Sequence, residues 1–300
     1  MSGPILLVGL SNVGDAVLTT PVINALHDLF PGAPLDIVAD RRSTAVYEPC
    51  PFRRRIFYKE KRAAFRGLPR LLADLRRERY DIVVDLRTDF LAYLVRAGRR
   101  FPQWRARPYG SHAVERHMGV IADLHGARPL PRVAVWPRRE DRAFAAAALP
   151  ANGRWLGVGP GAHWPPKIWP ARRFVELLAE VGNEFAGAVL FGDTADAAAA
   201  GEIAAAASIP CVNLCGRTSI LEAAAVLARC AAFVGNDSGL GHLAAAVGTP
   251  TLTLFGPGEP ERYRPWGPRA SWVEAPGRDL GQLRADAVAD SLRRTGITPS

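Results

Sequence analysis

The sequence of 300 residues is long enough for two α/β domains. Hydrophobic residues make up 48% and charged residues 22%, as in a soluble globular protein, and no apolar run approaches the about 20 residues that span a bilayer. The formal net charge is +9, the four cysteines lack the paired spacing of a zinc knuckle, and the N-terminus lacks the pattern of a signal peptide, so we expect a cytoplasmic protein.

The start of the chain predicts a strand, a turn, a helix and a second strand. Residues 5–8 form a continuous apolar run that is typical of a central parallel strand. Residues 16–30 have helical apolar spacing, and residues 35–39 are the next predicted strand. In such an α/β pattern, the turn after the first strand lies on the ligand side of the sheet.

The first turn, Gly9 to Gly14, has the glycine spacing of a P-loop. Asp15 and Ala16 stand where a P-loop needs Lys and then Ser or Thr, and an anionic side chain there would repel a triphosphate. We therefore exclude NTP hydrolysis, and the missing Gly-x-Gly-x-x-Gly pattern weakens a dinucleotide site. Asp15 is suited to act as a base, although the helix dipole alone also favours an acidic residue in a first turn.

Positive charge is concentrated in the first half of the chain. Residues 1–150 hold 25 Lys and Arg against 15 Asp and Glu, whereas residues 151–300 hold 13 against 14. The densest basic run includes Arg53, Arg54, Arg55, Lys59 and Lys61. This asymmetry predicts an anionic partner for the first half, unless the run is only a solvated face. Aromatic residues are not regularly interleaved with the basic ones, so we expect no nucleic-acid partner.

The rest of the chain continues the alternation of helices and strands. In the first half we expect a strand over 81–86 and helices over 68–79, 113–124 and 138–152. The second half predicts five more strands, at 155–158, 188–191, 211–214, 231–234 and 251–255. Helices at about 171–182, 195–207, 219–230 and 240–247 separate them.

This alternation predicts an α/β fold of two Rossmann-like, doubly wound domains that face each other across a cleft. The first domain is expected to cover residues 1–150 and the second residues 151–300, with a last helix that can pack back on the first domain. Ligands of such sheets bind at the carboxyl ends of the strands, so the cleft is the expected ligand site.

Two turns of the second half carry the polar residues of a candidate site. Lys167, the only lysine in residues 151–300, follows Gly159-Pro160-Gly161 in a Pro- and Gly-rich loop. Residues 237–242 form a Gly-rich turn that opens a helix, where free N–H groups and the helix dipole favour an anion. The alternatives are a surface lysine, a plain N-cap at Asp237 or Ser238, and a packed His242.

In combination, the motifs of the two halves resemble the heptosyltransferase family, glycosyltransferases of the lipopolysaccharide core. The resemblance rests on Leu10-Ser11-Asn12-Val13-Gly14-Asp15, Thr19-Thr20-Pro21, Asn236-Asp237-Ser238-Gly239, His242, Gly248-Thr249-Pro250 and Phe255-Gly256-Pro257. It covers about residues 5–31, 81–98, 155–192 and 213–260. The chain departs from the family at Ala162-His163, where some members have hydroxyl residues, and at Gly258, where Thr is frequent.

The resemblance implies an inverting transferase of the GT-B architecture that moves a heptose from ADP-heptose to an anionic glycolipid of the lipopolysaccharide core. The second domain would bind the nucleotide sugar and the first the lipid-linked or phosphorylated acceptor, at the inner face of the cytoplasmic membrane. Asp15 would be the general base, and no metal or other cofactor is implied. The implied donor-binding residues are Lys167, Thr218, Asp237, Ser238, Gly239 and His242. The basic run of Arg53, Arg54, Arg55, Lys59 and Lys61 is the expected acceptor-binding segment.

Three other functions remain open from the sequence. The first is a GT-B glycosyltransferase that uses another nucleotide sugar and an acceptor outside lipopolysaccharide. The second is an NAD-dependent oxidoreductase, against which the first turn counts. The third is a non-catalytic nucleotide-binding protein of the same fold, against which an intact Asp15 and Lys167 argue.

Overall fold

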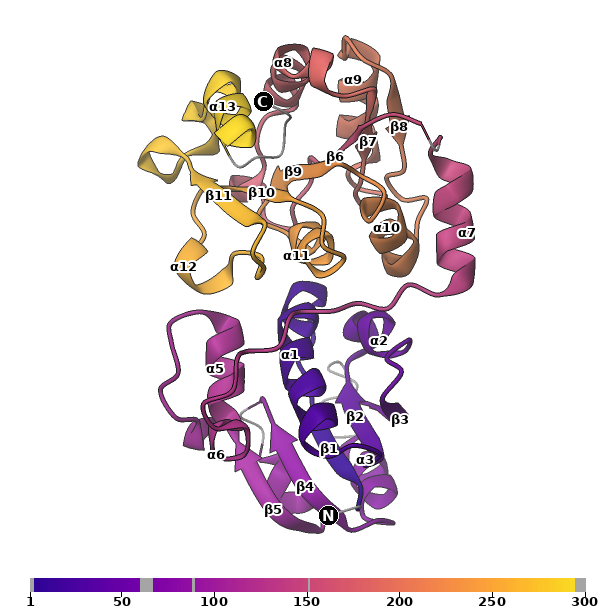
Figure 1. Cartoon of the computed structure of the whole chain (residues 1–300), viewed down its shortest axis with the longest axis vertical. Coiled ribbons are helices and arrows are strands. Elements are labelled where there is room, and N and C mark those ends of the chain that lie inside the picture. Colours follow the sequence, from indigo (N-terminus) through magenta and orange to yellow (C-terminus); the bar gives the residue numbers. More distant parts are fainter. Residues whose placement is uncertain (1–2, 60–66, 88–89, 151, 295–300) are drawn as a thin grey trace. The chain divides into compact units, whose positions relative to one another are not determined.

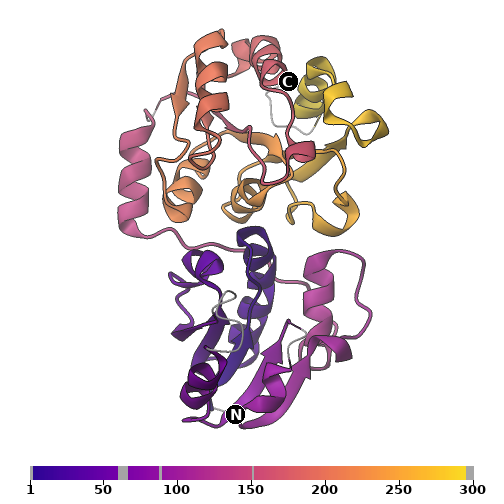
Figure 2. The same ribbon diagram turned by 180° about the vertical axis from the view of Figure 1, so that it is seen from behind.

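The chain consists of two units, residues 1–136 and 137–300. The computed structural model describes residues 3–59, 67–87, 90–150 and 152–294. Each unit is built around one sheet whose paired strands all run parallel, with helices on both faces (Figure 1 and, from behind, Figure 2). The expected pair of doubly wound α/β domains is thus present.

The first sheet has the strand order β3-β2-β1-β4-β5. Its strands are β1 (Ile5–Val8), β2 (Leu35–Ala39), β3 (Arg53–Tyr58), β4 (Tyr80–Asp85) and β5 (Ala97–Pro102). The three central strands are those that the apolar runs predicted. The two edge strands, β3 and β5, were not predicted, because an edge strand is paired on one side only and tolerates the arginines that both contain.

Helices cover both faces of the first sheet. The helices are α1 (Val13–Leu29), α2 (Arg41–Tyr47), α3 (Leu68–Leu75), α4 (Leu91–Leu94), α5 (Ala113–Val120) and α6 (Ala122–His125). Helix α1 continues through Pro21, which cannot donate a hydrogen bond to the carbonyl of Val17. The hydroxyl of Thr20 donates to that carbonyl instead, at 2.6 Å, so the Thr-Pro pair keeps α1 intact.

The second sheet has the strand order β11-β10-β9-β6-β7-β8. Its strands are β6 (Trp155–Gly159), β7 (Gly187–Leu190), β8 (Cys211–Asn213), β9 (Ala232–Asn236), β10 (Thr251–Phe255) and β11 (Ala270–Glu274). Five of the six were predicted from their apolar runs. The sixth, β11, is the half-exposed edge strand beside β10, so it too lacks the continuous apolar pattern of a central strand.

Helices cover both faces of the second sheet as well. They are α7 (Arg139–Ala148), α8 (Ala171–Glu180), α9 (Ala197–Ala206), α10 (Ile220–Leu227), α11 (Gly239–Ala246), α12 (Pro260–Tyr263) and α13 (Ala285–Arg294). Helix α7, which the sequence analysis placed at the end of the first domain, packs on α10 in the second unit. The last helix, α13, packs on α8, with Val288 and Leu292 in the core of its own unit.

The order of the strands fixes where ligands can bind in each sheet. In the first sheet the winding direction reverses between β1 and β4, and in the second between β6 and β9. At such a reversal the two loops after neighbouring strands diverge and leave a crevice at the carboxyl ends of the strands.

None of the helices in the described residues is both long and apolar enough to cross a bilayer.

Candidate functional site

The loops after β6 and β9 meet at the carboxyl edge of the second sheet, because these strands are neighbours. Lys167 ends a 3-10 helix over Pro165–Lys167 in the first loop, and Asp237 directly follows β9. The Lys167 ammonium group donates a hydrogen bond to Asp237 Oδ2 and forms an ion pair with it. The Asp237 side chain is 9% exposed and that of Lys167 is 27% exposed, so the pair is sheltered but open to a ligand.

Asn236, the last residue of β9, fastens the loop that carries Lys167. Its fully buried side chain accepts a hydrogen bond from the backbone N–H of Trp169 at 3.0 Å and donates one to the carbonyl of Pro160 at 2.7 Å. The ring of Trp169 is itself buried, and its Nε1 donates to the carbonyl of Leu283. The loop from 160 to 169 is therefore held at both ends, which limits where Lys167 can lie.

The start of α11 adds hydrogen-bond donors to the same edge. Ser238 occupies the N-cap position of α11, yet its side chain makes no capping hydrogen bond. Its hydroxyl oxygen is buried and finds no partner in the part of the chain that the structure describes. The N-cap alternative therefore does not account for the Ser238 side chain. The N–H groups of the first turn, from Gly239 onward, lie at the positive end of the helix and suit an anion.

The remaining two expected donor-binding residues, His242 and Thr218, lie on different elements. His242 is one turn into α11 and 7% exposed, so it is buried just behind the start of the helix. Thr218 precedes α10 in the loop after β8, three strands away from β9. Helix α10, which Thr218 precedes, packs on α11. The structure thus brings Lys167, Asp237, Ser238, Gly239 and His242 to the end of β9 and the start of α11, while Thr218 lies in the loop before the neighbouring helix α10.

Gly258, which departs from the family pattern, borders the ion pair directly. A Cβ atom at this position would lie 2.8 Å from Asp237 Oδ2 and 2.7 Å from the ring of Phe255. Any side chain at this position would therefore press on the carboxylate that pairs with Lys167. The glycine leaves Asp237 unhindered on this side.

Asp15 lies in the first turn of α1, at the carboxyl edge of the first sheet. The side-chain amide of Asn12 donates to Asp15 Oδ2 at 2.9 Å, and the hydroxyl of Thr19 donates to the Asp15 carbonyl at 2.8 Å. Asn12 and Thr19 therefore orient the carboxylate and the backbone of the candidate base. Both residues stand in motifs of the family resemblance, but the sequence alone did not predict a role for either.

Tyr47 and Asp85 support the turn around Asp15. The hydroxyl of Tyr47 lies under the first turn, where a Cβ at Gly9 would be 2.8 Å from it. Burial raises the pKa of the Tyr47 phenol, so it remains neutral. Asp85 ends the neighbouring strand β4, and its carboxylate accepts a hydrogen bond from the backbone N–H of Arg87 at 2.9 Å. Asp85 thus fixes the loop after β4, and Tyr47 packs against the first turn at Gly9.

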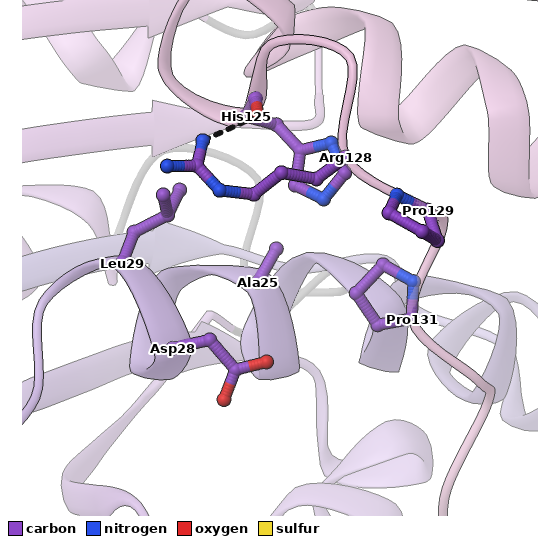
Figure 3. Close-up of a pocket in the computed structure, with 7 residues that line it drawn as sticks. All are labelled: Ala25, Asp28, Leu29, His125, Arg128, Pro129 and Pro131. Carbon is purple, nitrogen blue, oxygen red and sulfur yellow. Dashed lines mark hydrogen bonds between the residues drawn. The ribbon is translucent and has the colours of Figure 1, made fainter.

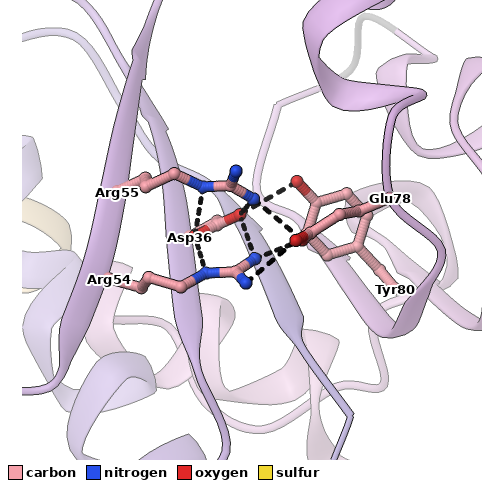
Figure 4. A network of polar contacts seen from close by, with 5 residues as sticks. All are labelled: Asp36, Arg54, Arg55, Glu78 and Tyr80. Carbon is pink, nitrogen blue, oxygen red and sulfur yellow. Dashed lines mark hydrogen bonds and ion pairs between the residues drawn. The ribbon is translucent and has the colours of Figure 1, made fainter.

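The arginines of the basic run that was expected to bind the acceptor begin β3 and lie at the amino edge of the first sheet. Arg54 and Arg55 flank the fully buried carboxylate of Asp36, and both also pair with Glu78 (Figure 4). Burial acts to raise the pKa of Asp36, but the hydrogen bonds from the two guanidinium groups outweigh it and lower the pKa. The structure therefore brings these arginines together with Asp36 and not with Asp15.

The remaining members of the run have different environments. Arg53 donates through Nε to the carbonyl of Glu48. Lys59 directly follows β3 at its carboxyl end, the same edge as Asp15, and its backbone N–H donates to the carbonyl of Ala39 at 2.9 Å. Lys61 lies outside the described residues. Within this run, Lys59 is thus the described residue whose position best suits an acceptor beside Asp15.

A pocket on the first unit contains none of the predicted site residues. It is a cavity of about 340 Å³ between the last turns of α1 and the segment after α6 (Figure 3). His125, Arg128, Asp28 and Leu29 are among its lining residues, and Arg128 donates to the carbonyl of His125 at 2.7 Å. Asp28 is more than three turns along α1 from Asp15, about 20 Å at 1.5 Å per residue, so the pocket is separate from the candidate base.

The described residues contain no group of three His, Cys, Asp or Glu side chains placed to hold a metal ion. The four cysteines are free thiols, and Cys50, Cys215 and Cys230 are buried. Burial raises the pKa of Cys215 and of Cys230 to about 12, so both are protonated and behave as small apolar side chains.

Comparison with known proteins places these features in a family. The family model described as glycosyltransferase family 9 (heptosyltransferase) matches residues 68–286. Lipopolysaccharide heptosyltransferase 2 of Salmonella typhimurium is 30% identical over 298 residues, covering 86% of this chain and 84% of that protein. Lipopolysaccharide heptosyltransferase 1 of Pseudomonas aeruginosa is 32% identical over 295 residues, covering 85% and 79%.

Solved structures show the same likeness in three dimensions. ADP-heptose lipopolysaccharide heptosyltransferase II of Escherichia coli superimposes with a TM-score of 0.82 at 25% identity, covering 97% of this chain and 98% of that chain. A second heptosyltransferase of E. coli, solved with ADP, has a TM-score of 0.80 at 22% identity, covering 97% and 99%. The second likeness supports the fold alone.

Proposed function

The chain belongs to glycosyltransferase family 9, the heptosyltransferases, and from this premise we propose that it transfers a heptose from ADP-heptose to an anionic glycolipid acceptor of the lipopolysaccharide core. It is a glycosyltransferase with the GT-B fold, made of two Rossmann-like domains. The observation that carries the proposal for the donor is the cluster of Lys167, Asp237 and the start of α11 at the reversal of the second sheet.

In the proposed reaction the second domain binds the nucleotide sugar. The Lys167 ammonium group and the N–H groups at the start of α11 face the diphosphate, with His242 behind them. These groups stabilise the negative charge that develops as the bond between the anomeric carbon and the diphosphate oxygen breaks. The existing ion pair supports this role, because it shows that an anionic oxygen fits against Lys167 at this edge.

The first domain supplies the base in this proposal. The Asp15 carboxylate takes the proton from the acceptor hydroxyl as its oxygen attacks the anomeric carbon, ADP leaves with its bonding electron pair, and the configuration inverts. The hydrogen bond from Asn12 supports the role, because it orients the carboxylate and leaves its second oxygen to receive the proton. We place the acceptor at the carboxyl edge of the first sheet, near Lys59, and the enzyme at the inner face of the cytoplasmic membrane.

A second candidate is a glycosyltransferase of the same fold that uses another nucleotide sugar. The departures from the family pattern at Ala162-His163 and Gly258 favour it, because Gly258 borders the Asp237 carboxylate. The two candidates share the proposed base and the lysine. They differ in the nucleotide sugar and in the acceptor, which lies outside lipopolysaccharide in the second candidate.

A ligand panel and a transfer assay test the proposal. Thermal unfolding is measured with ADP, UDP, GDP and NAD, because a ligand at a hundred times its Kd adds roughly 2.7 kcal/mol to the free energy of unfolding. We expect ADP to stabilise most, and ADP-heptose with a heptose-deficient core acceptor to release ADP. Stabilisation by UDP or GDP alone would favour the second candidate, and stabilisation by NAD alone would refute both.

A further inference from the structure

Four large apolar side chains are exposed together on the first unit, at α4 and just after β5. Phe90 is 64% exposed, Tyr93 43%, Leu94 37% and Trp104 53%. Tyr93 and Leu94 lie on α4, and Phe90 is its N-cap residue, with a left-handed backbone at φ 59°. The rings of Tyr93 and Trp104 stack with their centroids 6.0 Å apart. We call these four residues the aromatic patch.

The helix below the aromatic patch is firmly attached to the sheet. The inner face of α4 is buried, with Leu91, Ala92 and Val95 in the core of the first unit. The guanidinium group of Arg100, on β5, donates to the carbonyls of Ala92 and Val95 at 2.9 and 3.1 Å. The segment is therefore apolar on both faces, and its inner face is packed in the core while Phe90, Tyr93 and Leu94 stay exposed. A helical segment that is apolar all round is normally covered on all sides.

The charge around the patch indicates what covers it. Residues 90–114 contain five arginines and no Asp or Glu, but Arg107 pairs with Asp123 and Arg100 is bound to backbone carbonyls, so the free positive charge rests on the other arginines, Arg105 among them. Arg105 lies over the ring of Trp104, with its Cζ 4.8 Å from the ring centroid, and so places a cation next to the most polarisable side chain of the patch. Tryptophan and tyrosine favour the interface of a bilayer, and arginine favours anionic headgroups.

We propose that the aromatic patch, together with Arg105, docks on the surface of an anionic lipid bilayer. The inference deepens the proposed function and rests on it, because a glycolipid acceptor is presented from a membrane. A second copy of this chain suits the patch less well. A twofold interface would bring the patch of one copy against that of the other, and with it two arginine-rich segments of like charge.

Vesicle flotation of the full chain tests the docking directly. Wild type is expected to float with vesicles of phosphatidylcholine mixed with phosphatidylglycerol and to bind pure phosphatidylcholine weakly. The double variant Tyr93→Ser/Trp104→Ser is expected to lose about tenfold or more of this binding, because the bilayer no longer buries two rings. Tyr58→Ser is the matched control, since Tyr58 is a 50% exposed aromatic residue on the same unit outside the patch.

Fluorescence provides a second readout that does not depend on a destabilising change. Lipids brominated in their acyl chains should quench the tryptophan emission of wild type more than that of Trp104→Phe, which keeps an apolar ring at the patch. Thermal unfolding with ADP runs alongside for every variant. Loss of vesicle binding with an unchanged ADP response supports the inference.

Three results would overturn the inference. The first is equal vesicle binding by the double variant and wild type, and the second is equal quenching in Trp104→Phe. The third is a wild-type protein that does not bind vesicles but sediments as a dimer, while the double variant sediments as a monomer. That result would make the patch an interface between two copies of the chain. A protein that docks on vesicles but shows no response to ADP would instead refute the proposed function and leave the docking intact.

Discussion

The side-chain oxygen of Asn236 accepts a hydrogen bond of 3.0 Å from the backbone N–H of Trp169. The same side chain donates to the carbonyl of Pro160, so one buried amide closes the loop that carries Lys167. The residue at the end of β9 therefore controls the position of a lysine that lies on a different strand's loop. A buried donor or acceptor left without its partner costs about 1–3 kcal/mol.

We expect Asn236→Asp to weaken ADP binding about tenfold and to lower the free energy of unfolding by about 1–3 kcal/mol. The substitution keeps the shape but removes the donor to Pro160 and adds a buried negative charge. Calorimetric titration with ADP and urea denaturation measure the two effects. Asn213→Asp is the matched control, because Asn213 ends β8 and uses its side-chain oxygen as an acceptor for the Cys215 N–H, which Asp preserves. Unchanged ADP affinity in Asn236→Asp would show that the loop does not depend on this clamp.

Lys167→Ala should raise the KM for the donor and lower kcat. In the proposed reaction the lysine faces phosphates that become more negative as the sugar departs, so part of its contribution is expected in the transition state. Steady-state kinetics with varied donor concentration separate the two effects. Arg172→Ala, which removes an exposed cation from the adjacent α8, is the control and should change neither value. If the donor KM and kcat are also unchanged in Lys167→Ala, the lysine serves only the ion pair with Asp237.

Asp15→Asn is expected to reduce kcat by about 10²–10⁴ while ADP binding stays near that of wild type. The substitution keeps the shape and the neighbours of the side chain but removes the base. Single-turnover transfer with saturating donor is the measurement. Asp28→Asn removes an exposed carboxylate from the same helix and should leave turnover unchanged. Turnover of Asp15→Asn within a few-fold of wild type would remove Asp15 from the mechanism.

The residues that we propose for the chemistry stand out in the sequence because their types are unusual for their positions. Asp15 stands where a P-loop needs a lysine, and Lys167 is the only lysine of its half. Central strands were predictable for a related reason, since burial on both faces demands continuous apolar runs. The edge strands β3, β5 and β11 carry no such demand, and their sequences do not reveal them, whereas the edge strand β8 was predicted from the short run at 211–214.

Residues whose role is positional could not be assigned from the sequence. Asn236 and Asn12 stand inside quoted motifs, but their partners lie on loops that only the fold brings near. For the basic run, the sequence predicted a binding role for residues that prove to be structural in part. Its charge suggested a surface for an anion, yet Arg54 and Arg55 pair with Asp36, a buried carboxylate on the neighbouring strand. Net charge does not reveal which cations are already paired.

Stability of the first unit should fall as the pH drops below about 6.5, the ordinary pKa of histidine. Burial lowers the pKa of His117, which is 6% exposed and has its Nδ1 3.2 Å from the Leu18 carbonyl oxygen. A group with a lowered pKa in the fold resists protonation there and gains a proton on unfolding, so acid favours the unfolded chain. The loss of stability begins near the pKa of histidine in the unfolded chain and levels off below the pKa of His117 in the folded protein. Urea denaturation between about pH 7.5 and 5.5 measures this loss in the free energy of unfolding. The loss should be smaller for His117→Gln than for His163→Gln, the control at an exposed histidine. Equal pH dependence of the two variants would exclude His117 as the cause.

Asp36→Ala should destabilise the first unit by about 1–3 kcal/mol, because it removes the buried acceptor of the Tyr80 hydroxyl and of two guanidinium groups, which keep only Glu78. The Asp36 side chain is fully buried and also accepts a hydrogen bond of 3.0 Å from the hydroxyl of Tyr80. Arg54→Gln should cost less, since Arg54 is 32% exposed and Arg55 still pairs with Asp36. Urea denaturation gives both values. Asp74→Ala, which breaks an exposed ion pair with Arg77, is the control and should cost at most about 1 kcal/mol.

The same variants decide what the basic run does. If Arg54→Gln lowers stability but leaves the KM for the acceptor unchanged, the arginines hold β3 against β2 and the acceptor is bound elsewhere. We expect this result, because Arg54 and Arg55 lie at the amino edge of the first sheet, while Asp15 lies at its carboxyl edge. Lys59→Ala should instead raise the acceptor KM, since Lys59 follows β3 at the edge of Asp15. A rise for Arg54→Gln without loss of stability would restore the sequence-based prediction that the arginines bind the acceptor.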